Sequence, residues 1–321
     1  MLSSVLSNAK VLMALAAVVS PALCALFLKL FSGKLPKDQG REFAVDGQKS
    51  AGKIRGAGIL FVISFIICGL IFVPVSVEYA IYYVLIFAGM LSGYLDDAAE
   101  KPWGEYKKGA IDLVISVATA GTFVWKNPDL LRIVFFNHTL NIHPVIYVIL
   151  GAALVWIMIN AVNCTDGIDG FCTTLSTVSF ISIAAVILMR NTDKHMVDLT
   201  AILILSLFPY LWKNSEPSTM LMGDAGSRAL GLFMAMLLMK SGNAILVIPL
   251  CFVICVDGLI GIAKVSIRRF LKVKNFMEKI RTPLHDHSRK NKGWSNTQVI
   301  YRYCMIQIVI SALTLIIMKA A

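Results

Sequence analysis

The sequence predicts an all-α integral membrane protein in which about ten transmembrane helices form one domain. Of the 321 residues, 57% are hydrophobic and only 15% are charged, and the mean hydropathy is +0.75. Soluble domains carry about a quarter charged residues. Many apolar stretches also reach the roughly 17 to 25 residues that a helix needs to cross about 30 Å of hydrocarbon. Finally, positive charge is concentrated in alternate connections between these stretches.

Ten apolar stretches predict membrane-spanning helices over most of the chain. The first is too long for the apolar core of a cleavable signal peptide and is followed by Lys34 and Lys37, so we expect it to be retained. The stretches at 197–212 and 226–240 are the shortest. The predicted spans are 11–32, 57–75, 79–95, 110–126, 144–160, 171–189, 197–212, 226–240, 243–264 and 300–319.

The basic residues predict which ends of these helices face the cytoplasm. If the connections after odd-numbered spans share one face, that face holds about 23 of the 30 Lys and Arg residues, against about 7 on the other. The positive-inside rule then places the first face in the cytoplasm and both termini outside it. The predicted cytoplasmic loops, all within one polytopic domain that covers 1–321, are 33–56, 96–109, 161–170, 213–225 and 265–299.

The formal net charge of +11 does not require a nucleic-acid partner. Topology and attraction to anionic lipid headgroups explain basic loops of this kind, and an anionic substrate that binds in the same loops is the alternative. The seven cysteines lie mostly inside predicted spans. We interpret them as small packing residues rather than as a disulfide or metal framework.

Two polar groups on the predicted cytoplasmic face contain aspartates at helix ends. Asp96 and Asp97 follow the third span, and adjacent aspartates can share a divalent cation, with a solvated helix end as the alternative. Asp224 lies in the string Met-Gly-Asp-Ala-Gly-Ser, which opens a helix. Free N–H groups and a positive dipole end beside a carboxylate suit a phosphate with its metal, whereas ordinary capping by Asp224 is the alternative.

The string Asn-Ala-Val-Asn-Cys-Thr-Asp-Gly-Ile-Asp-Gly at 160–170 is a polar segment between two apolar runs. Asn160, Asn163, Asp166 and Asp169 recur at three-residue spacing, so helical geometry would place them on one stripe. A helix cap explains one Asp-Gly pair but does not require two such pairs and two amides. The pattern therefore favours a binding function.

The last predicted loop combines basic residues with a histidine pair. His285 and His287 suit contact with a pyrophosphate or proton transfer, whereas the basic segment 268–279 is also suited to lying on lipid headgroups. Asp257 lies inside the ninth predicted span and is a functional candidate, because an acid within a span is costly. Asp112 in the fourth span lies near a boundary, and we interpret it as structural.

Together these groups predict phosphoryl transfer at a membrane surface. This chemistry needs Mg²⁺ held by carboxylates, cations that neutralise developing charge, and a base or orienting group for the attacking oxygen. The membrane location indicates that one substrate is a lipid. The sequence has no Walker-type loop, Rossmann glycine fingerprint or zinc signature, so ATP hydrolysis and redox chemistry are poorly supported.

The residues resemble those of the polyprenyl-phosphate N-acetylhexosamine-1-phosphate transferase superfamily, and within it the phospho-N-acetylmuramoyl-pentapeptide transferases. The resemblance rests on Asp96-Asp97, the strings at 160–170 and 222–227, the histidine loop, and Lys-Gly-Trp-Ser-Asn-Thr-Gln-Val at 292–299. It implies ten helices with external termini, a Mg²⁺ cofactor, and a homodimer in the bacterial inner membrane.

The resemblance also implies a reaction. Phospho-MurNAc-pentapeptide would pass from UDP-MurNAc-pentapeptide to undecaprenyl phosphate, giving lipid I and UMP. This is a step of peptidoglycan synthesis, and it serves cell wall biogenesis, cell shape and cell division.

By the same resemblance, individual residues receive roles. Asp224 would bind Mg²⁺, and Asp96 and Asp97 would lie beside the attacking phosphate, with Asp96 as the base. His285 and His287 would face the pyrophosphate. The residues expected to bind the substrate are Lys49, Lys53, Arg55, Asn163, Asp166, Asp169, Asn214 and Leu221.

The sequence departs from the family pattern in three places. Three consecutive histidines of the family appear here as His285-Asp286-His287, and the acidic middle residue changes the local charge. Leu221 replaces an aromatic residue that would stack on the uracil. The segment 52–58 reads Gly-Lys-Ile-Arg-Gly-Ala-Gly where a Thr-Pro-Thr-Met-Gly-Gly string is expected.

Two other functions are compatible with part of this pattern. A related enzyme would transfer GlcNAc-1-phosphate from UDP-GlcNAc to undecaprenyl phosphate, but such enzymes lack the Lys-Gly-Trp-Ser tail found at 292–295. A more distant alternative is an ion-coupled transporter, for which inverted repeats and polar groups at mid-depth would be expected.

Overall fold

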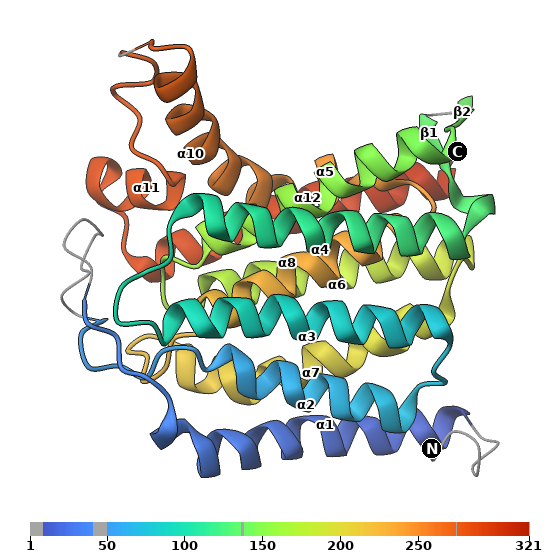
Figure 1. Cartoon of the computed structure of the whole chain (residues 1–321), viewed down its shortest axis with the longest axis horizontal. Coiled ribbons are helices and arrows are strands. Elements are labelled where there is room, and N and C mark those ends of the chain that lie inside the picture. Colours follow the sequence, from blue (N-terminus) through green and yellow to red (C-terminus); the bar gives the residue numbers. More distant parts are fainter. Residues whose placement is uncertain (1–8, 41–49, 136–137, 274, 321) are drawn as a thin grey trace.

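The computed structural model describes residues 9–40, 50–135, 138–273 and 275–320. Helices dominate this part of the chain, as the composition predicts. The long helices lie side by side in one bundle, and both ends of the chain lie at the same end of it (Figure 1). The helices are α1 (Ala9–Phe31), α2 (Gly58–Phe72), α3 (Val77–Asp97), α4 (Glu105–Lys126), α5 (Pro144–Thr165), α6 (Phe171–Arg190), α7 (Lys194–Asn214), α8 (Gly223–Lys240), α9 (Val247–Leu250), α10 (Phe252–Phe270), α11 (Leu284–Lys292) and α12 (Asn296–Ala320).

Short elements join some of these helices. Strands β1 (Arg132–Phe135) and β2 (His138–Asn141) form an antiparallel hairpin between α4 and α5, with Arg132 paired to Asn141. The hairpin lies at the same end of the bundle as the chain ends (Figure 1). The remaining elements are 3₁₀ turns, η2 (Ser32–Lys34), η4 (Pro128–Leu130) and η5 (Ala244–Leu246).

Seven of the described helices are long and apolar enough to cross a membrane, or up to eight if α9 and α10 count as one bent span. The other two predicted spans correspond to α2, an apolar helix of 15 residues, and α8, which carries three charged side chains in 18 residues. All ten predicted stretches therefore correspond to helical segments. A fold made of membrane-spanning helices is confirmed.

The prediction of one continuous span at 243–264 is wrong. Instead α9 and α10 meet at a bend of 94° next to Cys251. Pro249 lacks an N–H group and weakens the helix at this point. Gln307 of α12 pairs both freed backbone groups, since the N–H of Val253 donates to its Oε1 at 2.9 Å and its Nε2 donates to the carbonyl oxygen of Pro249 at 2.9 Å. This pairing lets α10 leave the bundle at an angle.

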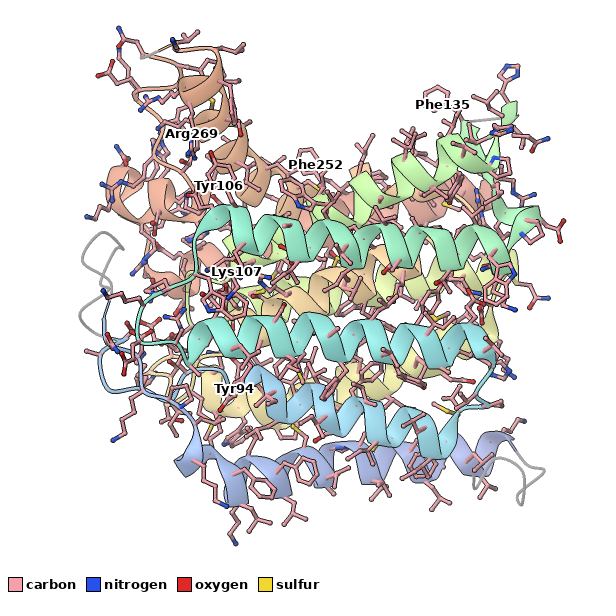
Figure 2. All side chains as sticks on the ribbon, viewed as in Figure 1. Tyr94, Tyr106, Lys107, Phe135, Phe252 and Arg269 are labelled. Carbon is pink, nitrogen blue, oxygen red and sulfur yellow. The ribbon has the colours of Figure 1, made fainter. Side chains whose placement is uncertain are left out.

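The projecting helix α10 is tied to the start of α4. Nη1 of Arg269 lies 3.0 Å from Oε2 of Glu105, and its Nη2 donates to the hydroxyl of Tyr106 at 3.1 Å. Figure 2 shows Arg269 and Tyr106 close together near the end of the bundle away from the hairpin.

Helix α8 is the centre of the bundle, and every residue from Gly223 to Lys240 is buried. Two glycines let neighbouring helices approach its first turn. A Cβ on Gly93 of α3 would overlap the backbone of Asp224, and a Cβ on Gly58 of α2 would overlap the backbone of Gly226. These contacts bring the C-terminal end of α3 and the N-terminal end of α2 onto the start of α8.

We predict that Gln307→Leu destabilises the protein, because it leaves the N–H of Val253 and the carbonyl of Pro249 buried without partners. The expected loss is about 1–3 kcal/mol, measured as a lower thermal unfolding midpoint in detergent. Thr314→Val on the same helix is the control, since that hydroxyl bonds only to the carbonyl of Ile310. Equal midpoints for the two variants would contradict this explanation of the bend.

Candidate active site

Three predicted carboxylates come together where α3 ends and α8 begins. Asp96 and Asp97 are the last residues of α3, and Asp224 lies in the first turn of α8. Asp96 is 6% exposed, Asp224 is 8% exposed, and the side chain of Asp97 has no exposed surface. Buried carboxylates require charged or hydrogen-bonding partners, and each of these has them.

Asp97 is held between Arg55 and the start of α8. Nε of Arg55 donates to its Oδ1 at 2.8 Å, and the N–H of Ala225 donates to its Oδ2 at 3.2 Å. The same guanidinium reaches Oδ2 of Asp38 through Nη1 at 3.0 Å. Arg55 thus joins two carboxylates that the sequence places far apart.

Arg55 and Asp38 each stabilise the charged form of the other. Burial alone would raise the pKa of Asp38, but hydrogen bonds from the Ser50 hydroxyl and the Gly40 N–H, with the charge of Arg55, lower this pKa below its ordinary value. Burial would likewise lower the pKa of Arg55, but the carboxylates of Asp97, Asp224 and Asp38 raise it above its ordinary value. Arg55 is therefore a permanent cation in this site.

Lys108 of α4 connects the other two carboxylates. Its Nζ forms an ion pair with Oδ2 of Asp96 and lies 3.5 Å from Oδ2 of Asp224. Asp96 also accepts a hydrogen bond of 2.7 Å from the N–H of Trp103. Lys107 stacks on the Trp103 ring, with Nζ 3.3 Å from the ring centroid. Lys108 is not among the residues predicted for the site, although it follows the aspartate pair closely in the sequence.

Asp224 is further surrounded by Asn163 and Arg228. Nδ2 of Asn163 donates to Oδ1 of Asp224 at 3.1 Å and to the Ser227 hydroxyl at 2.9 Å. Nε of Arg228 lies 3.7 Å from Oδ2 of Asp224, and its Nη1 pairs with Asp112 at 2.8 Å. The prediction omitted Arg228, although a charge four residues after Asp224 in an apolar helix was the available signal.

The residues of the polar string at 160–170 do not form the predicted single stripe, because they contact different parts of the site. Asn163 reaches Asp224, whereas Asp169 accepts hydrogen bonds from Lys53 at 3.0 Å and from the N–H of Ser218 at 3.1 Å. Asp166 is half-buried and is the C-cap residue that directly follows α5. The helix stops at this point, so Asp169 lies in the turn rather than on the helix face.

The first loop is joined to the segment before α8 by backbone hydrogen bonds. The N–H of Leu221 donates to the carbonyl of Ile54 at 2.7 Å, and the N–H of Ala57 donates back to the carbonyl of Leu221 at 3.0 Å. This pairing holds Lys53 and Arg55 over the carboxylates. Lys49 lies outside the described residues.

Both the oxygen and the nitrogen of the Asn214 side-chain amide form hydrogen bonds with the backbone. Its Oδ1 accepts from the N–H of Gly170 at 2.9 Å, and its Nδ2 donates to the carbonyl of Met220 at 2.8 Å. The residue is 3% exposed. It therefore joins the turn at 160–170 to the segment that carries Leu221.

The two predicted histidines have different surroundings. His285 is 2% exposed, and its Nδ1 lies 2.7 Å from Oδ2 of Asp257 while its N–H donates to Oδ1 at 2.7 Å. Its Nε2 faces Gly167, where an added Cβ would overlap it. His287 is half-buried, and its Nδ1 accepts a hydrogen bond of 3.3 Å from the N–H of Arg281.

The donor atoms near Asp224 fit a magnesium ion. Mg²⁺ prefers oxygen ligands and commonly takes one or two carboxylates, with water and substrate phosphates completing its shell. Asp96, Asp97 and Asp224 offer such oxygens beside Lys108 and Arg55. Within the described ranges, no three Asp, Glu, His or Cys side chains are arranged so that they could bind one metal ion by themselves. This set thus suits an ion that shares its ligands with a phosphate.

Comparison with known proteins places the chain among transferases. A model of the family described as "Glycosyl transferase family 4" matches residues 79–242. A phospho-N-acetylmuramoyl-pentapeptide-transferase of Treponema pallidum (strain Nichols) is 38% identical, over 85% of this chain and 80% of that protein. Proteins with the same name from Wolbachia sp. subsp. Brugia malayi and Helicobacter hepaticus are 28% and 26% identical, over 80% and 86% of this chain and 82% and 84% of their own lengths.

We predict that Arg228→Met destabilises the fold more than the double variant Asp112→Leu/Arg228→Met. Removing only the arginine leaves Asp112 as a buried, unpaired charge, which costs about 3–5 kcal/mol, whereas removing both charges costs much less. Thermal unfolding midpoints in detergent measure the difference. A double variant no more stable than the single one would contradict the assignment of this pair as a buried ion pair.

Proposed function

The chain belongs to glycosyl transferase family 4, and we propose that it transfers phospho-MurNAc-pentapeptide from UDP-MurNAc-pentapeptide to undecaprenyl phosphate. The products are lipid I and UMP, and the reaction is a step of peptidoglycan synthesis. The relatives are named for transfer of the phospho-N-acetylmuramoyl-pentapeptide group, which supports the identity of the transferred group. The apolar helices and the relatives support a multi-pass protein of the bacterial inner membrane.

One structural observation gives the main support for phosphoryl transfer. At one end of a bundle of apolar helices, buried carboxylates lie beneath partly exposed cations. The side chains of Lys53, Arg55 and Lys108 are 21%, 21% and 27% exposed, while those of Asp96 and Asp97 are 4% and 0% exposed. Incoming phosphates therefore meet the cations first. Such an arrangement suits a reaction between two phosphate-bearing substrates.

The proposed reaction is one displacement at phosphorus. An oxygen of undecaprenyl phosphate attacks the β-phosphorus of the nucleotide, the new P–O bond forms, and the bond to the α-phosphate oxygen breaks to release UMP. If the lipid phosphate arrives with a proton, Asp96 accepts it. Lys108 lies between Asp96 and Asp224 and neutralises charge that develops on the phosphates.

Asp224 is the proposed ligand of Mg²⁺, and the ion would polarise the diphosphate. Nδ2 of Asn163 donates to Oδ1 of Asp224 at 3.1 Å, which fixes the orientation of this carboxylate. Arg55 and the N–H of Ala225 fix Asp97 beside it. Asp97 therefore orients the first turn of α8 toward the attacking phosphate.

The nucleotide would bind along the loop that carries Lys53 and Arg55. These two cations would contact its phosphates, with Lys49 as a further candidate. Asn163, Asp166, Asp169 and Leu221 would form the walls of this side of the site. The buried amide of Asn214 supports an indirect role, in which it holds the turn at 160–170 against the segment of Leu221.

His285 and His287 are proposed to face the pyrophosphate, and Asp257 is proposed to position His285. A carboxylate only accepts hydrogen bonds, so Asp257 selects the tautomer of His285 with the proton on Nδ1. Nε2 is then directed toward Gly167 and the turn at 160–170. Asp257 thereby fixes which nitrogen is presented to the site.

We also propose a membrane topology and an oligomeric state for the protein. Ten helical segments and chain ends on one side of the bundle support ten spans with extracytoplasmic termini and a cytoplasmic active site. A homodimer is carried over from the resemblance to the family.

We predict that labelled UMP exchanges into UDP-MurNAc-pentapeptide only when undecaprenyl phosphate and Mg²⁺ are present. Asp224→Asn should lower this exchange by about 100-fold or more, because the proposed ligand of Mg²⁺ is lost. Asp96→Asn should lower it by about 100-fold as well, because the base is lost. Asp129→Asn, in the connection beside the hairpin, is the matched control and should leave the rate unchanged.

Two results would overturn this assignment. Incorporation of label into lipid from UDP-GlcNAc but not from UDP-MurNAc-pentapeptide would replace the substrate. Near wild-type turnover by Asp96→Asn would remove that residue as the base, and full activity of Asp224→Asn would remove it as the metal ligand.

We predict that Asp257→Asn lowers kcat by about 10- to 100-fold with a smaller change in KM, because His285 is no longer held in one tautomer. The ¹⁵N NMR signals of His285 should shift toward the form protonated on Nε2, while those of His287 stay in place. An unchanged tautomer with reduced activity would point to a packing role for Asp257 instead.

A further inference from the structure

Three turns meet at the end of the bundle opposite the carboxylate site. They are the start of β1, the turn between α6 and α7, and the turn after α8. A Cβ built on Gly242 would lie 3.7 Å from Nη2 of Arg132 and 3.4 Å from Cγ2 of Thr192. The side chains of Arg132 and Thr192 therefore converge on the same stretch of backbone. In Figure 2, Phe135 of β1 marks this end of the molecule, and Tyr94 and Lys107 mark the other.

Two arginines share this corner without a counter-charge. Arg190, the last residue of α6, lies two residues before Thr192, and the positive charge of Arg132 acts on its guanidinium. In the part of the chain that the structure describes, neither guanidinium has a hydrogen-bond or ion-pair partner. Nε of Arg132 and the hydroxyl of Thr192 are buried and unpartnered. Both arginines are half-buried, so the corner is still reachable from outside.

Two acids near the turn between α6 and α7 are engaged with other groups. Asp193 accepts a hydrogen bond of 2.6 Å from the hydroxyl of Tyr79 and pairs with Lys240 at 2.7 Å. Asp198 lies 3.7 Å from Nδ1 of His195. Neither Asp193 nor Asp198 therefore forms an ion pair with Arg132 or Arg190.

We propose that Arg132, Arg190 and Thr192 form a binding site for a phosphate group. A guanidinium presents parallel N–H donors that match two phosphate oxygens, and the Thr192 hydroxyl supplies a further donor. A bound phosphate would neutralise the repulsion between the arginines and pair the buried Nε and hydroxyl. No residue of this site belongs to the proposed transferase site.

The position of this corner indicates how a phosphate reaches it. The ends of apolar helices lie at the level of the lipid headgroups when a bundle spans a bilayer. The phosphodiester of an anionic phospholipid would therefore arrive laterally within the membrane, and an inorganic phosphate would arrive from solution. With the proposed topology, the lipid would belong to the outer leaflet.

Binding would fasten three separate turns to one another. The ligand would bridge the β1–β2 hairpin, which Asn243 already holds through Val134, to the turn between α6 and α7. Ligands that bind the folded state alone raise its stability by mass action. The site is thus expected to stabilise this end of the bundle.

The test measures the thermal unfolding midpoint of the full chain in neutral detergent at constant ionic strength. The probes are short-chain phosphatidylglycerol, short-chain phosphatidylcholine, inorganic phosphate and chloride. Phosphatidylglycerol should raise the midpoint of the wild type and of Lys194→Gln, a control at an exposed cation of the same turn. Arg132→Gln and Arg190→Gln should each weaken the apparent affinity by about tenfold or more.

A second measurement separates a binding site from a structural contact. Without any phosphate-bearing probe, Arg190→Gln should unfold at the same temperature as the wild type or higher, because repulsion is relieved. Stabilisation by phosphatidylglycerol alone identifies a headgroup site, and equal stabilisation by inorganic phosphate identifies a free phosphate site. Both results support the proposal.

The proposal fails if phosphatidylglycerol and inorganic phosphate leave the wild type unchanged, or if both arginine variants respond as the wild type does. It also fails if Arg190→Gln unfolds at a lower temperature in the absence of phosphate. UMP exchange by these variants should equal that of the wild type. The outcome is therefore independent of the proposed transferase activity.

Discussion

The structure depends on the burial of acidic side chains at the first turn of α8. Asp97 reaches the N–H of Ala225 only because Gly93 and Gly58 let α3 and α2 contact the backbone of this turn. Burial of these acids would be prohibitive without positive charges, which Arg55 supplies from the loop before α2 and Lys108 from the first turn of α4. Packing and charge pairing therefore constrain one another at this point.

The same arrangement explains how substrates can enter without a large reorganisation. The cations are partly exposed while the carboxylates beneath them are buried. A phosphate that binds Lys108 or Arg55 exchanges one anionic partner of that cation for another. The site thus has its charges in place before the substrate arrives, which is the condition for electrostatic catalysis.

The bend between α9 and α10 also bears on the candidate active site, because α10 carries Asp257, the partner of His285. In the bent arrangement, Asp257 of α10 lies against the backbone N–H and the ring of His285. Gln307 makes this possible by pairing the backbone groups freed at the break. A polar residue of α12 thereby determines the surroundings of a histidine on α11.

The sequence by itself determined the helical membrane fold and the helical segments, because apolar length is a property of neighbouring residues. The grouping of Asp96, Asp97 and Asp224 followed from their predicted position on one face and from the resemblance in local motifs. The sequence could not determine which cation pairs with which acid. Arg55 and Asp97, or Arg228 and Asp112, are separated by long stretches of chain, and their contact results from how the helices pack. The helix break, the buried role of Asn214 and the unpaired arginines at the opposite end were likewise decided by tertiary structure, since each depends on partners that no local pattern specifies.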